Sequence, residues 1–430
     1  MKTIPDIITP ELTGVPEYAL AAECNGVPVY TVECNEYDVV RITFFFRAGT
    51  SLQRVPFAAS ATANMLSEGT EGHGGREPLT SQQIAERLDY YGSYFDINID
   101  RDYVYVNFCM LSRFLQPTLA VAEEILLCPS FPEEELRTYA AKRRQRLAIE
   151  RLRVDTLARE ELARCLFGSE HPYGRISPAE AYDTLTRRDL TEHYHRCYTA
   201  ERCMVVCSGR MDCGVVEAVS RIVAQLPHDL SAAAPEFPAP ATVHESFIEH
   251  PDAVQSSLRV ARLLFPRTHP DFVGMQVVAT ALGGYMGSRL MQNLRERNGF
   301  TYGVVAAMVN FEREGYFAVS TQVDAGVTHQ ALDEIYAEIE RLRREPMPES
   351  EVEMVRNMML GEMMRILDGP FGLADVAIEN ILCGNPNSVL LRNMQEIRTI
   401  TPERIRSLAD RWLPREELIT VVAGRVGQAK

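Results

Sequence analysis

The two halves of the chain repeat one order of expected elements. Residues 198–212, YTAERCMVVCSGRMD, and residues 413–427, LPREELITVVAGRVG, each have the pattern of a helix end followed by a β-branched strand that stops at a glycine. Earlier in each half, at 44–66 and 259–284, a strand pattern precedes a helix rich in small residues. This shared order predicts two copies of one folding unit.

The middle of each half agrees with this prediction. Residues 94–108 and 302–324 show the alternation of strands, and residues 132–152 and 348–367 the periodicity of long amphipathic helices. We therefore expect an α+β fold of two homologous units, each an antiparallel sheet with helices packed on one face.

A proline-rich stretch, QLPHDLSAAAPEFPAPATVHES, lies between the halves. Its four prolines and small residues are incompatible with a helix or a central strand, which is typical of a linker. The predicted domains are 1–224 and 246–430, joined by a Pro/Ala-rich linker at 225–245.

Composition narrows the function classes for these 430 residues. The net charge of −15 disfavours a nucleic-acid partner, because phosphate binding relies on clustered lysine and arginine. No apolar run is long enough for a membrane span, and the first residues do not resemble a secretory signal. The ten cysteines form no CxxC pair, and several lie in apolar runs, so we expect a reducing, cytoplasmic location.

Two polar clusters have ordinary structural explanations. HYHRC, residues 193–197, lacks the spacing of the common zinc sites, so we interpret it as structural rather than metal-binding. KRRQR, residues 142–146, lies in a helix pattern with four glutamates around it and is interpreted as a solvated helix face.

The glycine-rich segment LGGYMGSRL contains Gly283, Gly284 and Gly287. It is neither a phosphate loop nor a GxGxxG turn. It could be a tight turn that enters a helix, or a mobile loop at the mouth of a substrate chamber, and the residues alone favour the turn.

The segment NLRERNGFTYGVV is more informative. Asn298 and Gly299 are typical of a helix end, and Tyr302 would open the next strand. Helix capping alone could explain these residues, since Arg295 would complement the helix dipole. Alternatively, the helix end brings Arg295 and Tyr302 together as two donors that could bind a peptide carbonyl and its oxyanion.

These motifs together resemble a known family. The segments RAGTSLQRVPFAASATANMLSEGT, LDYYGSYFDINIDRDYVYVNF, HPYGR and YTAERCMVVCSGRMD resemble the amino-terminal unit of the insulinase/pitrilysin-like zinc peptidases, family M16. LGGYMGSRLMQNLRERNGFTYGVVAAM resembles the carboxy-terminal unit, and the match is to the short two-unit bacterial branch. The resemblance implies a clam-like shell and raises the Arg295/Tyr302 hypothesis above capping.

The family's zinc motif, His-x-x-Glu-His on the first helix, is degenerate in this sequence. Aligned through MLSEGT, Ser60 and Asn64 stand where the two histidines belong, and Ala63 stands where the glutamate belongs. The region expected to supply the third ligand, TYAAKRRQRLA, has no carboxylate. We therefore expect no metal in this chain and no zinc-dependent hydrolysis by this chain alone.

In the short branch, the resemblance implies a split active site between two facing subunits. This chain is similar to the subunit that lacks zinc and supplies the Arg/Tyr pair to a peptide held with a zinc-bearing paralogue. Metallo-endopeptidase activity is then expected only in the heterodimer, with zinc in the partner. The alternative is a structural or peptide-binding pseudo-enzyme, possibly a homodimer.

Overall fold

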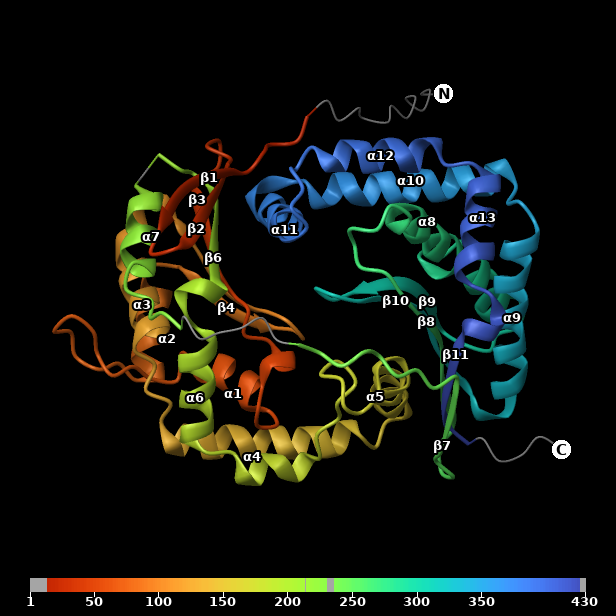
Figure 1. The fold of residues 1–430 in the computed structure, drawn as a ribbon, viewed down its shortest axis with the longest axis horizontal. Helices are drawn as coiled ribbons and strands as arrows, with labels where there is room; N and C mark the ends of the chain where they lie inside the picture. The colour runs from red at the N-terminus through yellow and green to blue at the C-terminus, as the bar shows by residue number, and fades with distance from the viewer. Residues whose placement is uncertain (1–13, 213, 230–235, 426–430) are drawn as a thin grey trace, which may run out of the picture.

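The computed structural model describes residues 14–212, 214–229 and 236–425. Two units face each other, with their sheets toward the middle of the molecule and most helices on the outside (Figure 1). The expected α+β fold of two related units in a clam-like shell is confirmed. Of the predicted linker, residues 230–235 lie outside the described part of the chain.

The first sheet has the strand order β1-β2-β6-β3-β5-β4. All neighbours pair antiparallel except β2 and β6, which run parallel with Val29 opposite Val205. The strands of this sheet are β1 (Ala19–Cys24), β2 (Val27–Glu33), β3 (Val39–Phe46), β4 (Tyr94–Ile99), β5 (Val104–Leu111) and β6 (Cys203–Gly209).

The second sheet has the order β7-β11-β8-β10-β9 and repeats the first sheet without its β1. Again one pair is parallel, β7 with β11, and the others are antiparallel. The parallel pair in each sheet was not predicted, since it joins strands from the start and the end of each half. The strands are β7 (Glu245–Glu249), β8 (Gln255–Leu264), β9 (Val304–Asn310), β10 (Gly315–Asp324) and β11 (Ile419–Gly424).

The helices follow the same repeat. The long helices expected at 132–152 and 348–367 are present as α4 (Glu133–Glu150) and α10 (Glu349–Ile366). The other helices of the first half are α1 (Ala58–Met65), α2 (Ser81–Tyr90), α3 (Leu115–Leu127), α5 (Val154–Phe167), α6 (Arg187–Cys197) and α7 (Val215–Val223). Those of the second half are α8 (Phe272–Gly283), α9 (Thr328–Arg344), α11 (Gly369–Leu382), α12 (Val389–Thr399) and α13 (Pro402–Trp412).

Shorter helical segments complete the described chain. One π-helix, η5, spans Met291–Arg297. The 3-10 segments are η1 (Thr50–Leu52), η2 (Ser112–Phe114), η3 (Ala179–Thr184), η4 (Ala200–Arg202), η6 (Ala325–Val327) and η7 (Arg415–Glu417).

Local signals fix several helix starts. Thr80 and Gln83 form a capping box at the start of α2, and Thr186 and Asp189 form another at the start of α6. Each box satisfies backbone donors that would otherwise lack partners in the first turn. Thr401 caps α13 with Pro402 in the first turn, where a missing N–H does no harm.

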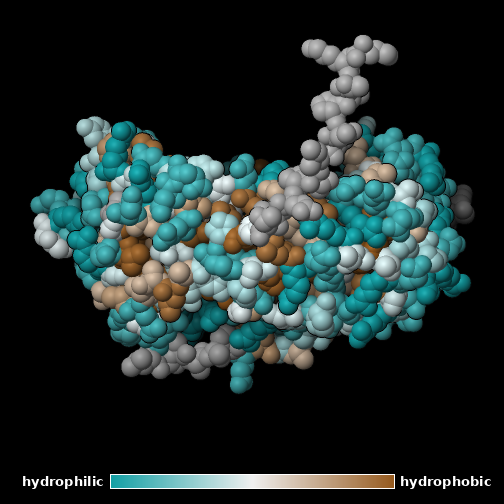
Figure 2. Space-filling model, turned by 90° about the horizontal axis from the view of Figure 1, so that it is seen from above, coloured by the Kyte–Doolittle hydropathy of each residue, from teal (hydrophilic) through white to brown (hydrophobic). Residues whose placement is uncertain are grey.

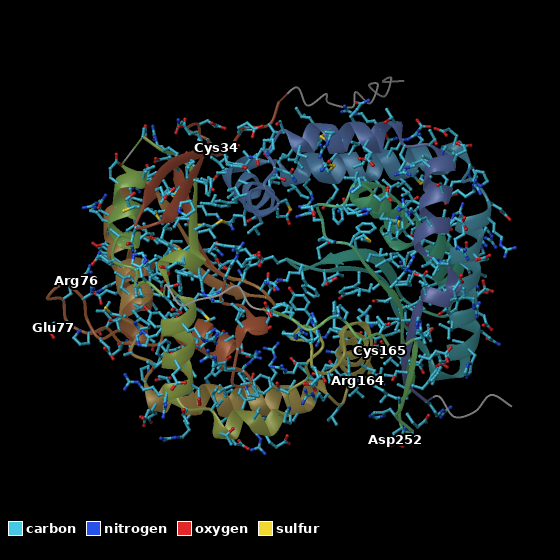
Figure 3. All side chains as sticks on the ribbon, in the orientation of Figure 1. Cys34, Arg76, Glu77, Arg164, Cys165 and Asp252 are labelled. Carbon is cyan, nitrogen blue, oxygen red and sulfur yellow. The ribbon has the colours of Figure 1, made fainter. Side chains whose placement is uncertain are left out.

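Each half supplies a helix to the sheet of the other half. Helix α5, from the first half, packs on β7, β8 and β11 of the second sheet. Its Ala158, Leu162 and Cys165 are buried in one apolar cluster with Ala261 and Val421. Figure 3 shows Arg164 and Cys165 on this helix, beside the second sheet.

Helix α11 makes the reciprocal contact with the first sheet. Its Leu373, Ala377 and Ile378 pack against a cluster that includes Phe45 and Val206. Ser208 on β6 donates a hydrogen bond of 2.5 Å to the carbonyl of Pro370 at the start of the helix. Thus helices from its own half cover one face of each sheet, and a helix from the other half packs on the opposite face.

The surface seen from above is largely hydrophilic, with apolar residues gathered in patches in the middle and toward the first unit (Figure 2). Among the described residues, none of the helices combines the length and the apolar composition required to cross a membrane.

Candidate functional site

Arg295 lies near the end of the π-helix η5. The amide N–H of Asn298 donates to the carbonyl of Asn293 at 3.1 Å, and that of Phe300 donates to the carbonyl of Leu294 at 2.8 Å. Gly299 has a φ of +64°, which confirms the helix end predicted from Asn-Gly. Turns of π-helix are rare and occur frequently at functional sites.

A hydrogen-bond network around the buried Asn293 fixes this helix end. The Nδ2 group of Asn293 donates to Glu334 at 2.7 Å and to Glu338 at 2.8 Å, both on α9. Asn298 donates through its own Nδ2 to Oδ1 of Asn293 at 2.7 Å. The sequence did not single out these residues. The missed signal is an Asn on an apolar helix face, opposite glutamates of a second helix.

The guanidinium of Arg295 is only weakly engaged. Its Nη1 donates to Sδ of Met286 at 3.3 Å, and its Nε lies 3.6 Å from a carboxylate oxygen of Glu296. About a third of the side chain is exposed. Most of its hydrogen-bonding capacity therefore remains available to a ligand.

Tyr302 follows in the loop before β9 and is 90% exposed. Its phenol has no hydrogen bond within the described chain. The phenol is therefore available as a hydrogen-bond donor to a ligand.

Arg295 and Tyr302 line the same cavity, which has a volume of about 680 Å³. Gln255 and Thr301 also line it, together with Val254, Glu296, Gly299, Phe300 and Asp324. A second cavity, of about 320 Å³, shares Gln255, Thr301 and Tyr302 with the first. The structure thus places the two predicted site residues around one open space, with a second space next to Tyr302.

Gly283, Gly284 and Gly287 do not lie together in one loop. Gly283 is the last residue of α8, Gly284 caps that helix, and only Gly287 lies in the turn beyond it. A Cβ on Gly283 would lie 2.6 Å from the backbone nitrogen of Ala306 on β9. Close packing of helix on strand therefore explains Gly283, because no side chain fits there.

The degenerate positions lie on α1. Ser60 donates through Oγ to the carbonyl of Phe57 at 3.0 Å, and Asn64 donates through Nδ2 to the carbonyl of Ser60 at 2.7 Å. Ala63 is fully buried in the core. The two polar side chains thus bond to their own helix, and Ala63 belongs to its packing face.

The surroundings of α1 do not fit a zinc ion. Burial raises the pKa of Tyr139 on α4 to about 12, so the phenol beside Ser60 stays protonated. A serine, an alanine and an asparagine beside a neutral phenol supply none of the imidazole or carboxylate ligands that zinc requires. Within residues 14–212, 214–229 and 236–425, no group of three His, Cys, Asp or Glu side chains could hold a metal ion.

The HYHRC segment has a structural role in the fold. His193 is 2% exposed on α6 and donates through Nε2 to the carbonyl of Ala48 at 3.1 Å. Burial lowers its pKa to about 4. His195 is exposed on the other side of the helix, so the two imidazoles do not converge on one site.

In KRRQR, Arg144 pairs with Asp183 and Arg146 with Glu150 at the surface.

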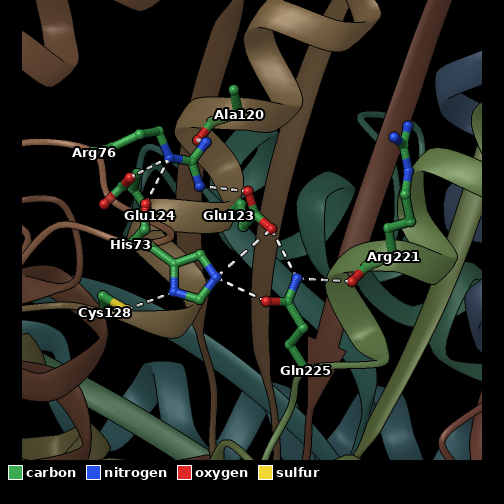
Figure 4. Close-up of polar contacts among 8 residues, drawn as sticks. All are labelled: His73, Arg76, Ala120, Glu123, Glu124, Cys128, Arg221 and Gln225. Carbon is green, nitrogen blue, oxygen red and sulfur yellow. Dashed lines mark hydrogen bonds and ion pairs between the residues drawn. The ribbon is translucent and has the colours of Figure 1, made fainter.

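A further polar network holds the loop after α1, which includes Arg76 and Glu77 at the edge of the molecule in Figure 3. Arg76 pairs with Glu123 at 2.5 Å and with Glu124 at 2.7 Å (Figure 4). His73 lies between Gln225, at 2.7 Å, and Sγ of Cys128, at 3.3 Å.

This Cys–His contact is not a nucleophile with its base. Burial, together with the carboxylates of Glu124, Glu71 and Glu123, raises the pKa of the Cys128 thiol. Cys128 also caps the carboxyl end of α3, where the helix dipole disfavours a thiolate. The network anchors the loop to α3 and to the turn that follows α7.

Comparison with known proteins tests the resemblance to the M16 family. A family model described as the peptidase M16 inactive domain matches residues 184–359. An uncharacterized zinc protease of Bacillus subtilis, YmxG, is 19% identical over 81% of this chain and 85% of its own. The predicted resemblance to the M16 peptidase family is thereby confirmed.

Two solved structures are similar to this chain over nearly its whole length. A structure titled peptidase M16 inactive domain, from Pseudomonas fluorescens, is 24% identical, covers 94% of this chain and 97% of its own, and has a TM-score of 0.83. A protease from Helicobacter pylori, 15% identical, covers 95% of this chain and 100% of its own, with a TM-score of 0.84. These two structures share the fold. The inactive-domain match, with the degenerate donors on α1, supports a catalytically inactive M16 subunit.

Proposed function

We propose that this chain is the zinc-free subunit of a two-chain M16 peptidase and binds unfolded peptide through Arg295 and Tyr302. The observation that carries the proposal is that both donors line one cavity while their polar groups are little used by the protein itself. The partner would be a paralogue that supplies the zinc and its activated water, and the complex would be cytoplasmic.

In this proposal, the chain's own contribution is electrostatic. The guanidinium of Arg295 and the phenol of Tyr302 donate hydrogen bonds to the carbonyl oxygen of the peptide bond to be cut. As that bond is attacked, negative charge develops on the oxygen, and both bonds strengthen. Removing one such donor typically lowers turnover by about 10²–10³.

The test is a comparison of two exposed tyrosines. Tyr302→Phe removes the donor, and Tyr90→Phe alters another exposed tyrosine, 82% exposed on α2. Each variant is co-expressed with a zinc-bearing paralogue, and peptide turnover and zinc content of the purified complex are measured. We expect Tyr302→Phe to lower turnover about 100-fold with zinc content unchanged, and Tyr90→Phe to have little effect.

Two results would overturn the proposal. Unchanged turnover in the Tyr302→Phe complex would remove the assigned role of the phenol. Stoichiometric zinc and peptide cleavage in a preparation of this chain alone would remove the need for a partner. Peptide binding by a homodimer, with no cleavage in any mixture, would favour the peptide-binding pseudo-enzyme instead.

A further inference from the structure

The second cavity beside Tyr302 is strongly polar. It lies on the face of the second sheet that α5 covers, and it is lined by Asp155 on that helix and by Arg259 on β8. Ser320 and Gln322 on β10 line the same space. With a volume of about 320 Å³, it is large enough for one side chain of a bound peptide.

Arg259 is the positively charged side chain among the residues that line this cavity. Its side chain is 14% exposed and forms an ion pair with Asp155. Burial lowers the pKa of its guanidinium. Asp155 raises this pKa and the nearby Arg159 lowers it, so both charges lie close to Arg259. One carboxylate therefore faces more than one arginine here.

Arg159 and Arg101 add two cations around this pair. Arg159 lies one helical turn after Asp155 on α5, is exposed, and has no hydrogen bond or ion pair in the described part of the chain. Arg101, in the turn between β4 and β5, likewise has no side-chain hydrogen bond or ion pair there. Tyr316 on β10 lies close enough to both Arg101 and Arg259 for their charges to lower the pKa of its phenol, although burial raises it overall.

The nearby carboxylate of Asp102 attracts Arg101, but both of its oxygens are engaged by other donors. Its Oδ1 accepts a hydrogen bond of 2.6 Å from the phenol of Tyr173, and its Oδ2 accepts one of 2.8 Å from the backbone N–H of Glu312. Burial raises the pKa of this carboxyl, which disfavours its charged form. Three guanidinium groups thus lie close together, with Arg159 near enough to both Arg259 and Arg101 to affect the pKa of each, in a chain whose net charge is −15.

We propose that Arg101, Arg159 and Arg259 form a carboxylate-binding subsite next to Tyr302, which selects peptides with an acidic residue beside the bound carbonyl. This rests on the proposed function of Tyr302. Guanidinium groups suit the planar carboxylate because they can donate two parallel hydrogen bonds to it. Partial burial strengthens the attraction, since water screens these charges less than it does at the open surface.

The first experiment measures binding to the purified full-length chain. Two fluorescein-labelled ten-residue peptides differ only in a central Glu or Gln, and their affinities are compared by fluorescence anisotropy at low and high salt. We expect the Glu peptide to bind about tenfold more tightly at low salt, with a smaller difference at high salt. Equal affinities at low salt would overturn the inference while leaving peptide binding intact.

Variants locate the preference in the subsite. Arg159→Gln, an exposed substitution, should reduce the Glu/Gln ratio to about threefold or less. Arg153→Gln, at another exposed arginine next to the same helix, should leave the ratio unchanged. Tyr302→Phe should weaken both peptides equally. A ratio that survives Arg159→Gln would overturn the inference.

A small dicarboxylate separates this inference from the proposed function. Glutarate should raise the melting temperature of the unaltered chain and have less effect on Arg159→Gln. If no peptide binds but this glutarate shift is present, peptide binding fails and the carboxylate subsite stands. If neither peptides nor glutarate bind, both proposals fail.

Discussion

Asn298 donates a hydrogen bond of 2.7 Å from its Nδ2 to Oδ1 of Asn293, and this bond closes the helix end that carries Arg295. A second bond from the same Nδ2 reaches the carbonyl of Asn293 at 3.1 Å. Asn293 is itself held by Glu334 and Glu338 on α9. The position of Arg295 thus depends on an amide pair, buried at Asn293 and exposed at Asn298, that does not line the cavity.

Asn298→Ala tests this dependence. The loss of two hydrogen bonds should lower the free energy of unfolding by about 1–2 kcal/mol. If Asn298 positions Arg295, turnover of the proposed two-chain complex should also fall, about tenfold, because a small displacement of a donor weakens its bond to the developing charge. Denaturant titration and steady-state kinetics measure the two effects.

The matched control is Asn64→Ala, which removes an exposed asparagine bonded to its own helix. It should change stability and turnover little. A stability loss in Asn298→Ala with kcat and KM both unchanged would show that the amide pair only stabilises the fold.

His193 should give the protein a specific sensitivity to acid. Its pKa is about 4 in the folded chain because of burial, against about 6.5 when unfolded. The unfolded chain therefore takes up a proton first as the pH falls. The contribution of neutral His193 to the free energy of unfolding is fully present above pH 6.5. It is lost as the pH falls from about 6.5 to 4, which lowers the free energy of unfolding by up to about 3 kcal/mol.

His193→Gln should flatten this part of the stability–pH curve, measured by denaturant titration from pH 8 to pH 4. His195→Gln, at the exposed histidine on the same helix, should leave the slope as it is. An equal slope in the chain and in His193→Gln would assign the acid sensitivity to other groups.

Two glycines in helices of the second unit should respond in opposite ways to alanine. Gly283→Ala places a Cβ 2.6 Å from the backbone of β9, so we expect a loss of about 1–3 kcal/mol of unfolding free energy. Gly361→Ala, in the interior of α10, has no heavy atom within 4 Å of the new Cβ and should stabilise the chain by about 0.5–1 kcal/mol. Thermal or denaturant unfolding of both variants checks this, and a tolerated Gly283→Ala would contradict the close packing of α8 on β9.

The exchange of helices can be tested at Arg41 on β3. Its guanidinium pairs with Asp375 at 2.7 Å and donates to the carbonyl of Phe371 at 3.0 Å, both on α11. Arg41→Ala should lower the free energy of unfolding by about 1–2 kcal/mol. It should also speed proteolytic cleavage between α10 and α11, because α11 separates from the first sheet more often.

Arg188→Ala serves as the control for this prediction, since it removes a surface pair with Glu192 on a single helix. It should leave the stability almost unchanged, because solvent screens an exposed pair of this kind. Equal cleavage rates between α10 and α11 in both variants would mean that Arg41 does not hold α11 on the sheet.

The sequence alone was sufficient for the repeat, the long helices and the helix end at Asn298–Gly299, because all three depend on local periodicity or on one residue's backbone preference. The exchange of α5 and α11 was not predictable in this way. The apolar face of α5, with Ala158 and Leu162, shows that the helix packs against something but not which sheet it covers. The subsite likewise depends on long-range contacts, since Arg101, Arg159 and Arg259 come from three separate elements.

The reciprocal placement of α5 and α11 has a consequence for how such a chain can be divided. Either half, produced without the other, would expose a row of apolar side chains, such as Phe45 and Val206 in the first sheet, to water. Severing the backbone near residue 240 should therefore yield two fragments that become soluble and ordered only when they are made together. The two units are therefore expected to fold and unfold together, as one cooperative structure.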